Sequence, residues 1–275
     1  MKHKQTLRQV LVVSGLALCA VSDGFIFGQM SGMIDALRDE SSTIKLTDDD
    51  ISTIAAIVNI TCFFGFAVLV GLTEVLGRRK TLTIISIPVL ICWLMVYFAQ
   101  DKSMLLASRA IVGLAFGGIL VMTYINVGEY VSPNMRSFCL NITYGIGTSL
   151  GTMLGHVLCL FMHWRNVALI GLIPSALSAF MPLFWVESPS WLATHKRFDE
   201  CEEAFKALHI STEASERELR TLINCQKNQN IIPKGSNPFI QLVKKFIEMY
   251  CESESVLIKA SIEKSVKLNC NEKIS

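Results

Sequence analysis

Charged side chains are scarce in this chain, and neither sign dominates. Only 17% of its 275 residues are Asp, Glu, Lys or Arg, whereas soluble domains average about 25%. The net charge of +2, together with the lack of a basic patch interleaved with aromatic residues, argues against a nucleic-acid-binding protein. Hydrophobic residues make up 51% of the chain, and the mean hydropathy is +0.45. This composition favours a membrane protein.

Metal-binding and disulfide patterns are also missing. The 9 cysteines include no C-x-x-C pair, which argues against a structural zinc site and against a disulfide-stapled secreted domain. We expect small buried or free thiols, no metal ion and no cofactor. A G-x-S-G nucleophile motif is absent as well, and His156 and His163 have no evident partner. Because a serine nucleophile needs a neighbouring base, the sequence does not predict an enzyme.

The chain does contain six apolar stretches of membrane-spanning length. A hydrocarbon core about 30 Å thick needs roughly 20 helical residues. The first stretch is too long for the apolar region of a signal peptide and lacks a clear cleavage site, so we interpret it as a retained helix. The predicted spans are Val10–Met30, Ile51–Gly71, Leu82–Ala99, Leu105–Val127, Phe138–Phe161 and Val167–Val186. The predicted fold class is an all-α membrane protein, a six-transmembrane-helix bundle with additional cytosolic helices.

Lysine and arginine are concentrated on one side of the predicted bundle, which identifies that side as cytosolic. If the six helices alternate, the basic residues on this side are Lys2, Lys4, Arg8, Arg78, Arg79, Lys80, Arg136, Lys196 and Arg197. The opposite side receives mainly the acids Asp35, Asp39, Glu40, Asp48, Asp49 and Asp50. We therefore predict a multi-pass protein of the plasma membrane with both termini in the cytosol.

The chain becomes polar after Pro189. We predict a transmembrane bundle over residues 1–187, a cytosolic helical linker over 188–230 and a polar, partly disordered tail over 231–275. Within the linker, Asp199-Glu200-Cys201-Glu202 resembles a capping box. A short amphipathic helix is expected to run to about residue 208 and a second to cover about 212–225. The apolar patch at 239–247 is too short to span a membrane and predicts an interfacial helix.

Four motifs carry the charged groups and glycines of the bundle. They are Leu72-Thr73-Glu74-Val75-Leu76-Gly77-Arg78-Arg79, Arg109-x3-Gly113-x3-Gly117-Gly118, Glu129-x3-Pro133-x2-Arg136 and Glu187-Ser188-Pro189-Ser190-Trp191-Leu192. Their kind and order resemble the sugar porter family of the major facilitator superfamily, and are most similar to its insect facilitated trehalose transporter-like branch. The resemblance covers about residues 10–227 and the amino-terminal half of the family only. The chain departs from the family pattern at Val70, Glu74, Val75, Ser137, Val186 and Ser190.

Small residues recur at helix-contact spacing within two of the spans. They are Gly113 and Gly117, then Gly147, Gly151 and Gly155. Steps of four place them on one helix face and let two backbones approach closely. We expect ordinary close packing within the bundle at these positions.

Several charged residues lie at predicted cytosolic helix ends. They are Glu74, Arg78, Arg79, Glu129, Arg136 and Glu187. Bidentate Arg–carboxylate pairs among them would latch the bundle. Because an exposed pair contributes only about 0–1 kcal/mol, a latch needs several acting together, which suits a transporter whose two states differ by a few kcal/mol. The alternative is that these charges only set the topology and contact lipid headgroups.

Asp23 is the one clear carboxylate inside a predicted span. An intramembrane acid is a functional candidate, and a hydrogen-bonded structural role is the alternative. The resemblance places Met30 where proton-coupled members of the family carry an acid, which favours facilitated diffusion. It also places Phe27, Met30 and Tyr144 at the central substrate cavity, with Tyr144 replacing a glutamine. Core packing is the alternative for these three side chains.

The resemblance therefore implies a facilitative transporter of a sugar, hexose or trehalose, that works by alternating access. The sugar and the lipid bilayer would be its partners. Because no seventh apolar stretch follows residue 186, we expect a chain truncated after its sixth helix that pairs with a second half or with another copy. The alternative hypothesis is a non-transporting regulatory or dominant-negative partner of a full-length carrier.

Overall fold

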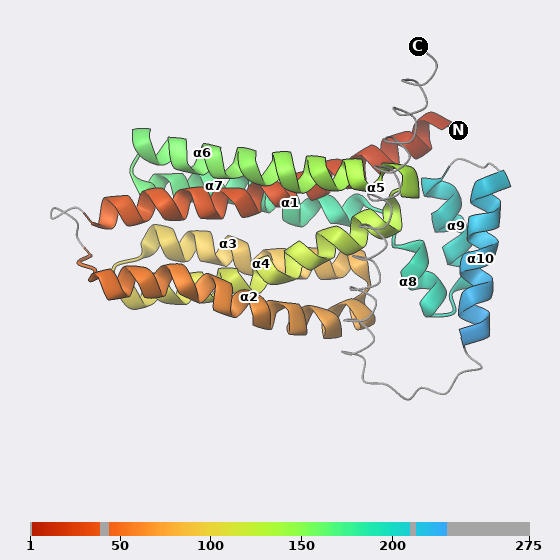
Figure 1. Cartoon of the computed structure of the whole chain (residues 1–275), viewed down its shortest axis with the longest axis horizontal. Helices are drawn as coiled ribbons and strands as arrows, with labels where there is room; N and C mark the ends of the chain where they lie inside the picture. Colours follow the sequence, from red (N-terminus) through yellow and green to blue (C-terminus); the bar gives the residue numbers. More distant parts are fainter. Residues whose placement is uncertain (1, 39–43, 210–212, 230–275) are drawn as a thin grey trace, which may run out of the picture. The chain divides into compact units, whose positions relative to one another are not determined.

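Helices account for the regular structure of the residues that the structure describes (Figure 1). The computed structural model describes residues 2–38, 44–209 and 213–229, and every element in these ranges is helical. This confirms the predicted all-α fold class. The predicted interfacial helix at 239–247 and the predicted disordered tail lie outside the described residues.

Six helical segments are long and apolar enough to cross a membrane, judged by length and composition. Four are single helices, α1 (Lys2–Leu37), α2 (Asp48–Leu76), α3 (Arg78–Phe98) and α4 (Lys102–Tyr130). The fifth combines α5 (Pro133–Leu140), the π-helix η1 (Asn141–Thr148) and α6 (Ser149–Phe161). The sixth combines α7 (Trp164–Phe180) with the 3₁₀ turn η2 (Met181–Phe184). The six predicted spans are confirmed. Most helices extend a few residues further than predicted, because backbone hydrogen bonding continues into polar ends that hydropathy does not detect.

Glycines set the closest approaches between the helices, as their spacing predicted. The largest helix contacts join α1 to α6 and α2 to α4. A methyl group at Gly117 would collide with the Cys62 carbonyl oxygen of α2, and one at Gly113 would lie 2.5 Å from the Val58 carbonyl oxygen. On α6, a methyl group at Gly155 would lie 2.7 Å from the Phe25 carbonyl oxygen of α1. Small residues therefore fix the α1–α6 and α2–α4 spacing.

Three shorter helices follow the sixth span: α8 (Pro189–Thr194), α9 (Phe198–Leu208) and α10 (Glu213–Gln229). They share an apolar core formed by Trp191, Leu192, Ala193, Cys201, Ala204, Phe205 and Leu219. The predicted helix to residue 208 is confirmed, and the second helix is longer than predicted. The predicted capping box is wrong, because α9 begins at Phe198 and the side chain of its N-cap residue, Arg197, makes no capping hydrogen bond to the helix backbone.

Helix α9 also contacts the start of α1. The Gln5 side chain donates from Nε2 to the Lys206 carbonyl oxygen over 2.8 Å, and Arg8 Nη1 lies 3.5 Å from the Ala207 carbonyl oxygen. These contacts satisfy carbonyl groups near the C-terminus of α9, where helices leave them without an intrahelical partner. The described residues belong to one compact unit by their contacts, and the predicted domain boundary after residue 187 stays a prediction.

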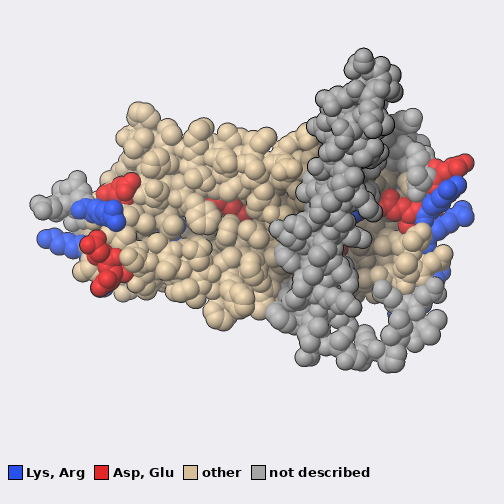
Figure 2. Space-filling view, viewed as in Figure 1, with Lys and Arg blue, Asp and Glu red and all other residues tan. Residues whose placement is uncertain are grey.

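Charged side chains gather at the two ends of the helices (Figure 2). On the face shown, the described surface between the ends is almost free of charge, apart from a small acidic area midway along. We call the end that carries α8–α10 the α8 end. The other end, which carries Phe98 and Trp164, is called the opposite end.

Candidate functional site

A buried ion pair lies at the α8 end, between the start of α3 and the end of α4. Arg78 donates from Nε to Glu129 Oε2 and from Nη2 to Glu129 Oε1, both over 3.0 Å. Only 7% of the Arg78 side chain and 11% of the Glu129 side chain are exposed. Two parallel charge-assisted hydrogen bonds of this kind give both strength and a defined orientation. The sequence placed both residues in one network, and the structure brings them together.

Glu187 caps the start of α3 from the segment that follows η2. Its Oε1 atom accepts hydrogen bonds from the backbone N–H groups of Arg78 (2.9 Å), Arg79 (3.2 Å) and Ser188 (3.1 Å). A carboxylate at a helix N-terminus is favoured by the unpaired N–H groups and by the helix dipole. The contact requires glycine at position 77, whose φ is +85° and whose added Cβ would lie 2.7 Å from Glu187 Oε2.

Further hydrogen bonds tie this cluster to α8. Ser188 donates from Oγ to Glu129 Oε2 over 2.6 Å, and Tyr130 donates its hydroxyl to the Val186 carbonyl oxygen over 2.8 Å. Arg79 donates from Nη1 to the Trp185 carbonyl oxygen over 3.0 Å. Sequence reasoning missed Ser188 and Tyr130. The Ser-Pro pair at 188–189 is a helix-start signal that would have identified Ser188, which caps α8.

Among the described residues, the side chains of two predicted network members, Arg136 and Glu74, form no hydrogen bond or ion pair with the other members. Arg136 donates from Nε to the Val131 carbonyl oxygen over 3.2 Å. Glu74 has an exposed side chain, its charge acts on Arg78 only from a distance, and its backbone carbonyl oxygen accepts from Trp191 Nε1 over 3.4 Å. We therefore define the α8-end cluster as Arg78, Arg79, Glu129, Glu187 and Ser188.

Asp23 lies in the middle of α1 and is 1% exposed. Neither of its carboxylate oxygens has a hydrogen-bond partner in the described part of the chain. Cys19, Cys62 and Tyr144 lie within range of its electrostatic field. The alternative predicted for Asp23 is a hydrogen-bonded structural role. Asp23 has no hydrogen-bond partner for that role among the described residues. An unpaired ionised carboxylate in such a setting is costly, so Asp23 keeps its place as a functional candidate.

A second buried polar chain links α4, α1 and α7. Arg109 Nη2 donates to Gln29 Oε1 over 2.8 Å, and Gln29 Nε2 donates to the Trp164 carbonyl oxygen over 3.3 Å. Arg109 is 2% exposed and forms no ion pair within the described ranges. Sequence reasoning placed Arg109 in a motif but did not find its partner, because Gln29 is 80 residues distant along the chain.

The three predicted substrate residues are half-buried on α1 and η1. The Phe27 ring meets Phe116 of α4 edge-on, with ring centroids 5.1 Å apart. The Tyr144 ring stacks on Tyr124 of α4, with centroids 4.9 Å apart and an interplanar angle of 11°, and its hydroxyl donates to the Leu120 carbonyl oxygen over 3.0 Å. Tyr144 also lies within η1, and π-helical segments are frequent at functional sites. Both aromatic side chains therefore contact α4.

The fold is that of the major facilitator superfamily. A solved structure of the proton:xylose symporter XylE bound to 6-bromo-6-deoxy-D-glucose matches with a TM-score of 0.72 and 15% identity, covering 82% of this chain and 54% of that one. An inward open structure of the xylose transporter XylE from E. coli matches with a TM-score of 0.66 and 14% identity, over 82% of this chain and 58% of that one.

The chain belongs to the sugar transporter family described as "Sugar (and other) transporter", whose family model matches residues 9–245. Sugar transporter ERD6-like 6 of Arabidopsis thaliana is 31% identical over 72% of this chain and 39% of its own length. Facilitated trehalose transporter Tret1 of Bombyx mori is 24% identical over 86% of this chain and 46% of its own length. The predicted resemblance is confirmed, and the relatives are transporters, which agrees with the prediction of a protein that is not an enzyme. The chain spans less than half the length of these relatives.

Proposed function

We propose that this integral membrane protein supplies a six-helix bundle to a facilitative sugar transporter. The α8-end cluster is the observation that carries the proposal, because it joins α3, α4 and α8 through the buried Arg78–Glu129 pair. Breaking a buried pair costs about 3–5 kcal/mol when one partner is removed. That cost is the penalty for leaving a buried charge unpaired, so the cluster favours a state of an alternating-access carrier in which Arg78 and Glu129 stay together.

The proposed substrate is a sugar, a hexose or trehalose. Family membership and the named sugar and trehalose transporters among the relatives support this class. We assign Phe27, Met30 and Tyr144 to the substrate side of the bundle, and the buried Asp23, one turn before Phe27 on α1, stays a functional candidate. Met30 supports facilitated diffusion, because a thioether cannot take up a proton as a coupling acid does.

Alternating access requires a second structural unit on the other side of the substrate. We propose that a second half or another copy of this chain fills that place, since the chain spans less than half the length of the relatives it matches. Uptake of labelled trehalose and glucose into vesicles that contain the purified chain alone tests this directly.

The matched variants for this uptake assay are Arg78→Ala and Arg217→Ala. Arg217 is an exposed arginine of α10 that pairs with Glu213, so it controls for loss of a positive charge. We expect the parent chain to take up sugar. Arg78→Ala should reduce this uptake, and Arg217→Ala should leave it unchanged. Absence of uptake, with reduced flux through a full-length relative in the same vesicles, would support the regulatory alternative. Absence of both effects would contradict the regulatory alternative and transport by copies of this chain alone.

We further propose that the α8 end faces the cytosol at the plasma membrane. The lysine and arginine bias supports this orientation. Cys225 of α10 is exposed, so a membrane-impermeant maleimide should label it only after cells are permeabilised. The chain used for this labelling test keeps Cys225 and carries the substitutions Cys251→Ser and Cys270→Ser.

Cys201 serves as the internal control in this labelling test. Its thiol is buried. The pKa of this thiol is raised to about 11, mainly by burial and to a smaller extent by the neighbouring charge of Glu202. Because the thiolate is the reactive form, Cys201 should stay unlabelled in both conditions. Labelling of Cys225 in intact cells would overturn the proposed orientation.

A further inference from the structure

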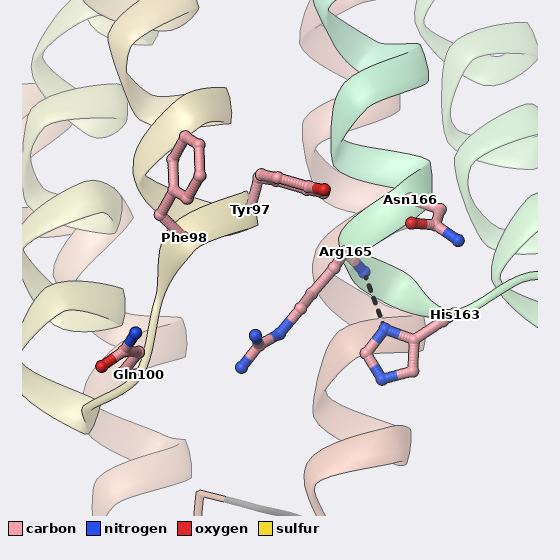
Figure 3. Close-up of a pocket in the computed structure, with 6 residues that line it drawn as sticks. All are labelled: Tyr97, Phe98, Gln100, His163, Arg165 and Asn166. Atoms are coloured by element: carbon pink, nitrogen blue, oxygen red, sulfur yellow. Dashed lines mark hydrogen bonds between the residues drawn. The ribbon is translucent and has the colours of Figure 1, made fainter.

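An open cavity of about 350 Å³ lies at the opposite end, between the end of α3 and the start of α7. Its lining residues are Tyr97, Phe98, Gln100, His163, Arg165 and Asn166. Figure 3 shows the Arg165 side chain reaching from α7 toward Gln100, with the two aromatic rings of α3 above it. The lining thus combines two aromatic rings, two amides, one imidazole and one guanidinium. It contains no carboxylate.

Two stripes of exposed apolar side chains lead to this cavity. On α3 the stripe has steps of three and four residues and consists of Ile84, Ile87, Ile91, Leu94 and Phe98. On α7 it consists of Leu169, Ile173, Leu177 and Phe180. The first stripe ends at Phe98, which lines the cavity, and the second begins three residues after Asn166, which lines it from the other side.

The two helices that carry the stripes are direct neighbours. Trp93 of α3 donates from Nε1 to Ser175 Oγ of α7 over 2.8 Å. A methyl group at Gly171 would lie 2.7 Å from the Trp93 ring. The two apolar surfaces therefore flank one helix–helix contact, and both terminate at the same polar cavity.

Arg165 is held in place while most of its donors stay available. Its Nη2 atom donates to the Ala99 carbonyl oxygen over 2.7 Å, and its guanidinium carbon lies 5.0 Å from the centroid of the Trp164 ring. A guanidinium has five N–H donors in a fixed planar fork, and Arg165 forms no ion pair with the residues that the structure describes. A guanidinium that is already oriented can donate two parallel hydrogen bonds to two oxygens of a phosphate group.

We propose that this cavity binds the phosphate group of a membrane phospholipid, with Arg165 as its main ligand. The acyl chains lie along the α3 and α7 stripes, and Tyr97 and Phe98 occupy the interfacial level where aromatic residues collect in membrane proteins. A free sugar or a free phosphate would match the polar cavity but would not contact the two stripes, whereas one phospholipid reaches the cavity and the stripes together. Charge and apolar surface together therefore favour a phospholipid.

Native mass spectrometry of the purified chain in detergent tests this proposal. The probes are phosphatidylglycerol, a diacylglycerol with the same acyl chains, and glycerol phosphate. We expect phosphatidylglycerol to bind and the other two to bind at least about tenfold more weakly, since one charge-assisted pair is worth about that ratio. Equal binding of diacylglycerol would overturn the role of Arg165, and equal binding of glycerol phosphate would overturn the lipid as the source of the phosphate.

Variants separate this cavity from other lipid contacts. Arg165→Ala should weaken phosphatidylglycerol binding about tenfold, and Arg165→Lys should give an intermediate loss, because lysine keeps the charge but not the planar fork. Arg217→Ala is the matched control on α10 and should have no effect. Circular dichroism checks that each variant is folded. If Arg165→Ala and Arg165→Lys both bind the lipid as the parent chain does, the proposal is wrong, and this result is independent of any transport assay.

Discussion

The two ends of the helical bundle each contain an arginine– or lysine–carboxylate pair, but in different surroundings. At the α8 end, Arg78 and Glu129 pair with 7% and 11% of their side chains exposed. At the opposite end, Lys102 and Asp50 pair over 3.2 Å with 60% and 25% exposed. Water and salt screen the second pair and not the first. Charge pairs of similar length therefore carry different energetic weight at the two ends.

Removal of Glu129 gives the largest effect that this comparison predicts. Glu129→Ala leaves Arg78 buried without its carboxylate, and we expect the free energy of unfolding to fall by about 3–5 kcal/mol. Thermal and denaturant unfolding in detergent measure the loss. Glu129→Gln is the matched control and should lose less, because it keeps a hydrogen-bond acceptor for Arg78. A loss below about 1 kcal/mol for Glu129→Ala would mean that burial does not strengthen the pair.

Gly77→Ala tests the geometry that brings Glu187 to the same cluster. A non-glycine residue at φ +85° is strained, and the new Cβ would press on the Glu187 carboxylate. We expect a loss of about 1–3 kcal/mol. Gly71→Ala is the control, since a Cβ there meets nothing within 4 Å. Equal stability changes for the two variants would contradict the claim that Gly77 positions Glu187.

A smaller effect is expected from His209, which follows α9 at the α8 end. Burial lowers the pKa of His209, and the nearby charges of Glu218 and Arg136 act in opposite directions on it. In the unfolded chain His209 takes up its proton near the ordinary pKa of about 6.5. Between that value and the lower folded pKa the unfolded chain binds more protons, so stability falls as the pH drops through this window.

His209→Gln isolates this contribution, because it removes the titration and keeps a polar side chain. The difference in unfolding free energy between parent and variant, measured from neutral to mildly acidic pH, should change in the variant's favour as the pH falls. A difference that is independent of pH would show that His209 titrates alike in both states. The His209 ring stacks on Phe205, with centroids 4.4 Å apart, so a constant offset between the two chains is expected in addition.

Lys102→Ala should have the smallest effect. It removes the exposed pair with Asp50, which is worth about 0–1 kcal/mol, and the loss should shrink further in high salt. The comparison with Glu129→Ala at two salt concentrations is the sharpest form of the experiment. If Lys102→Ala were as damaging as Glu129→Ala, exposure would not be the property that distinguishes the two ends.

Parts of the candidate site were predictable from sequence, and others were not. The motifs placed Arg78, Glu129 and Glu187 at neighbouring helix ends, because alternation of apolar spans brings those ends to one side of the membrane. They did not predict that, of the six charged residues, only Arg78 and Glu129 form an ion pair in the described structure, since several carboxylates and arginines compete there. No sequence pattern indicates the Arg109–Gln29 contact or the π-helix around Tyr144, because both depend on how helices that are distant in the chain pack together.

The sequence by itself determined the six spans, their helical structure and the family, because hydropathy, charge bias and motif order are properties of local composition. Only the tertiary structure decided which partners meet. Arg78 reaches a carboxylate 51 residues away, and its backbone N–H reaches another 109 residues away. It also decided that one charge pair is buried and another exposed, since burial depends on the helices that surround a side chain rather than on its neighbours in the chain.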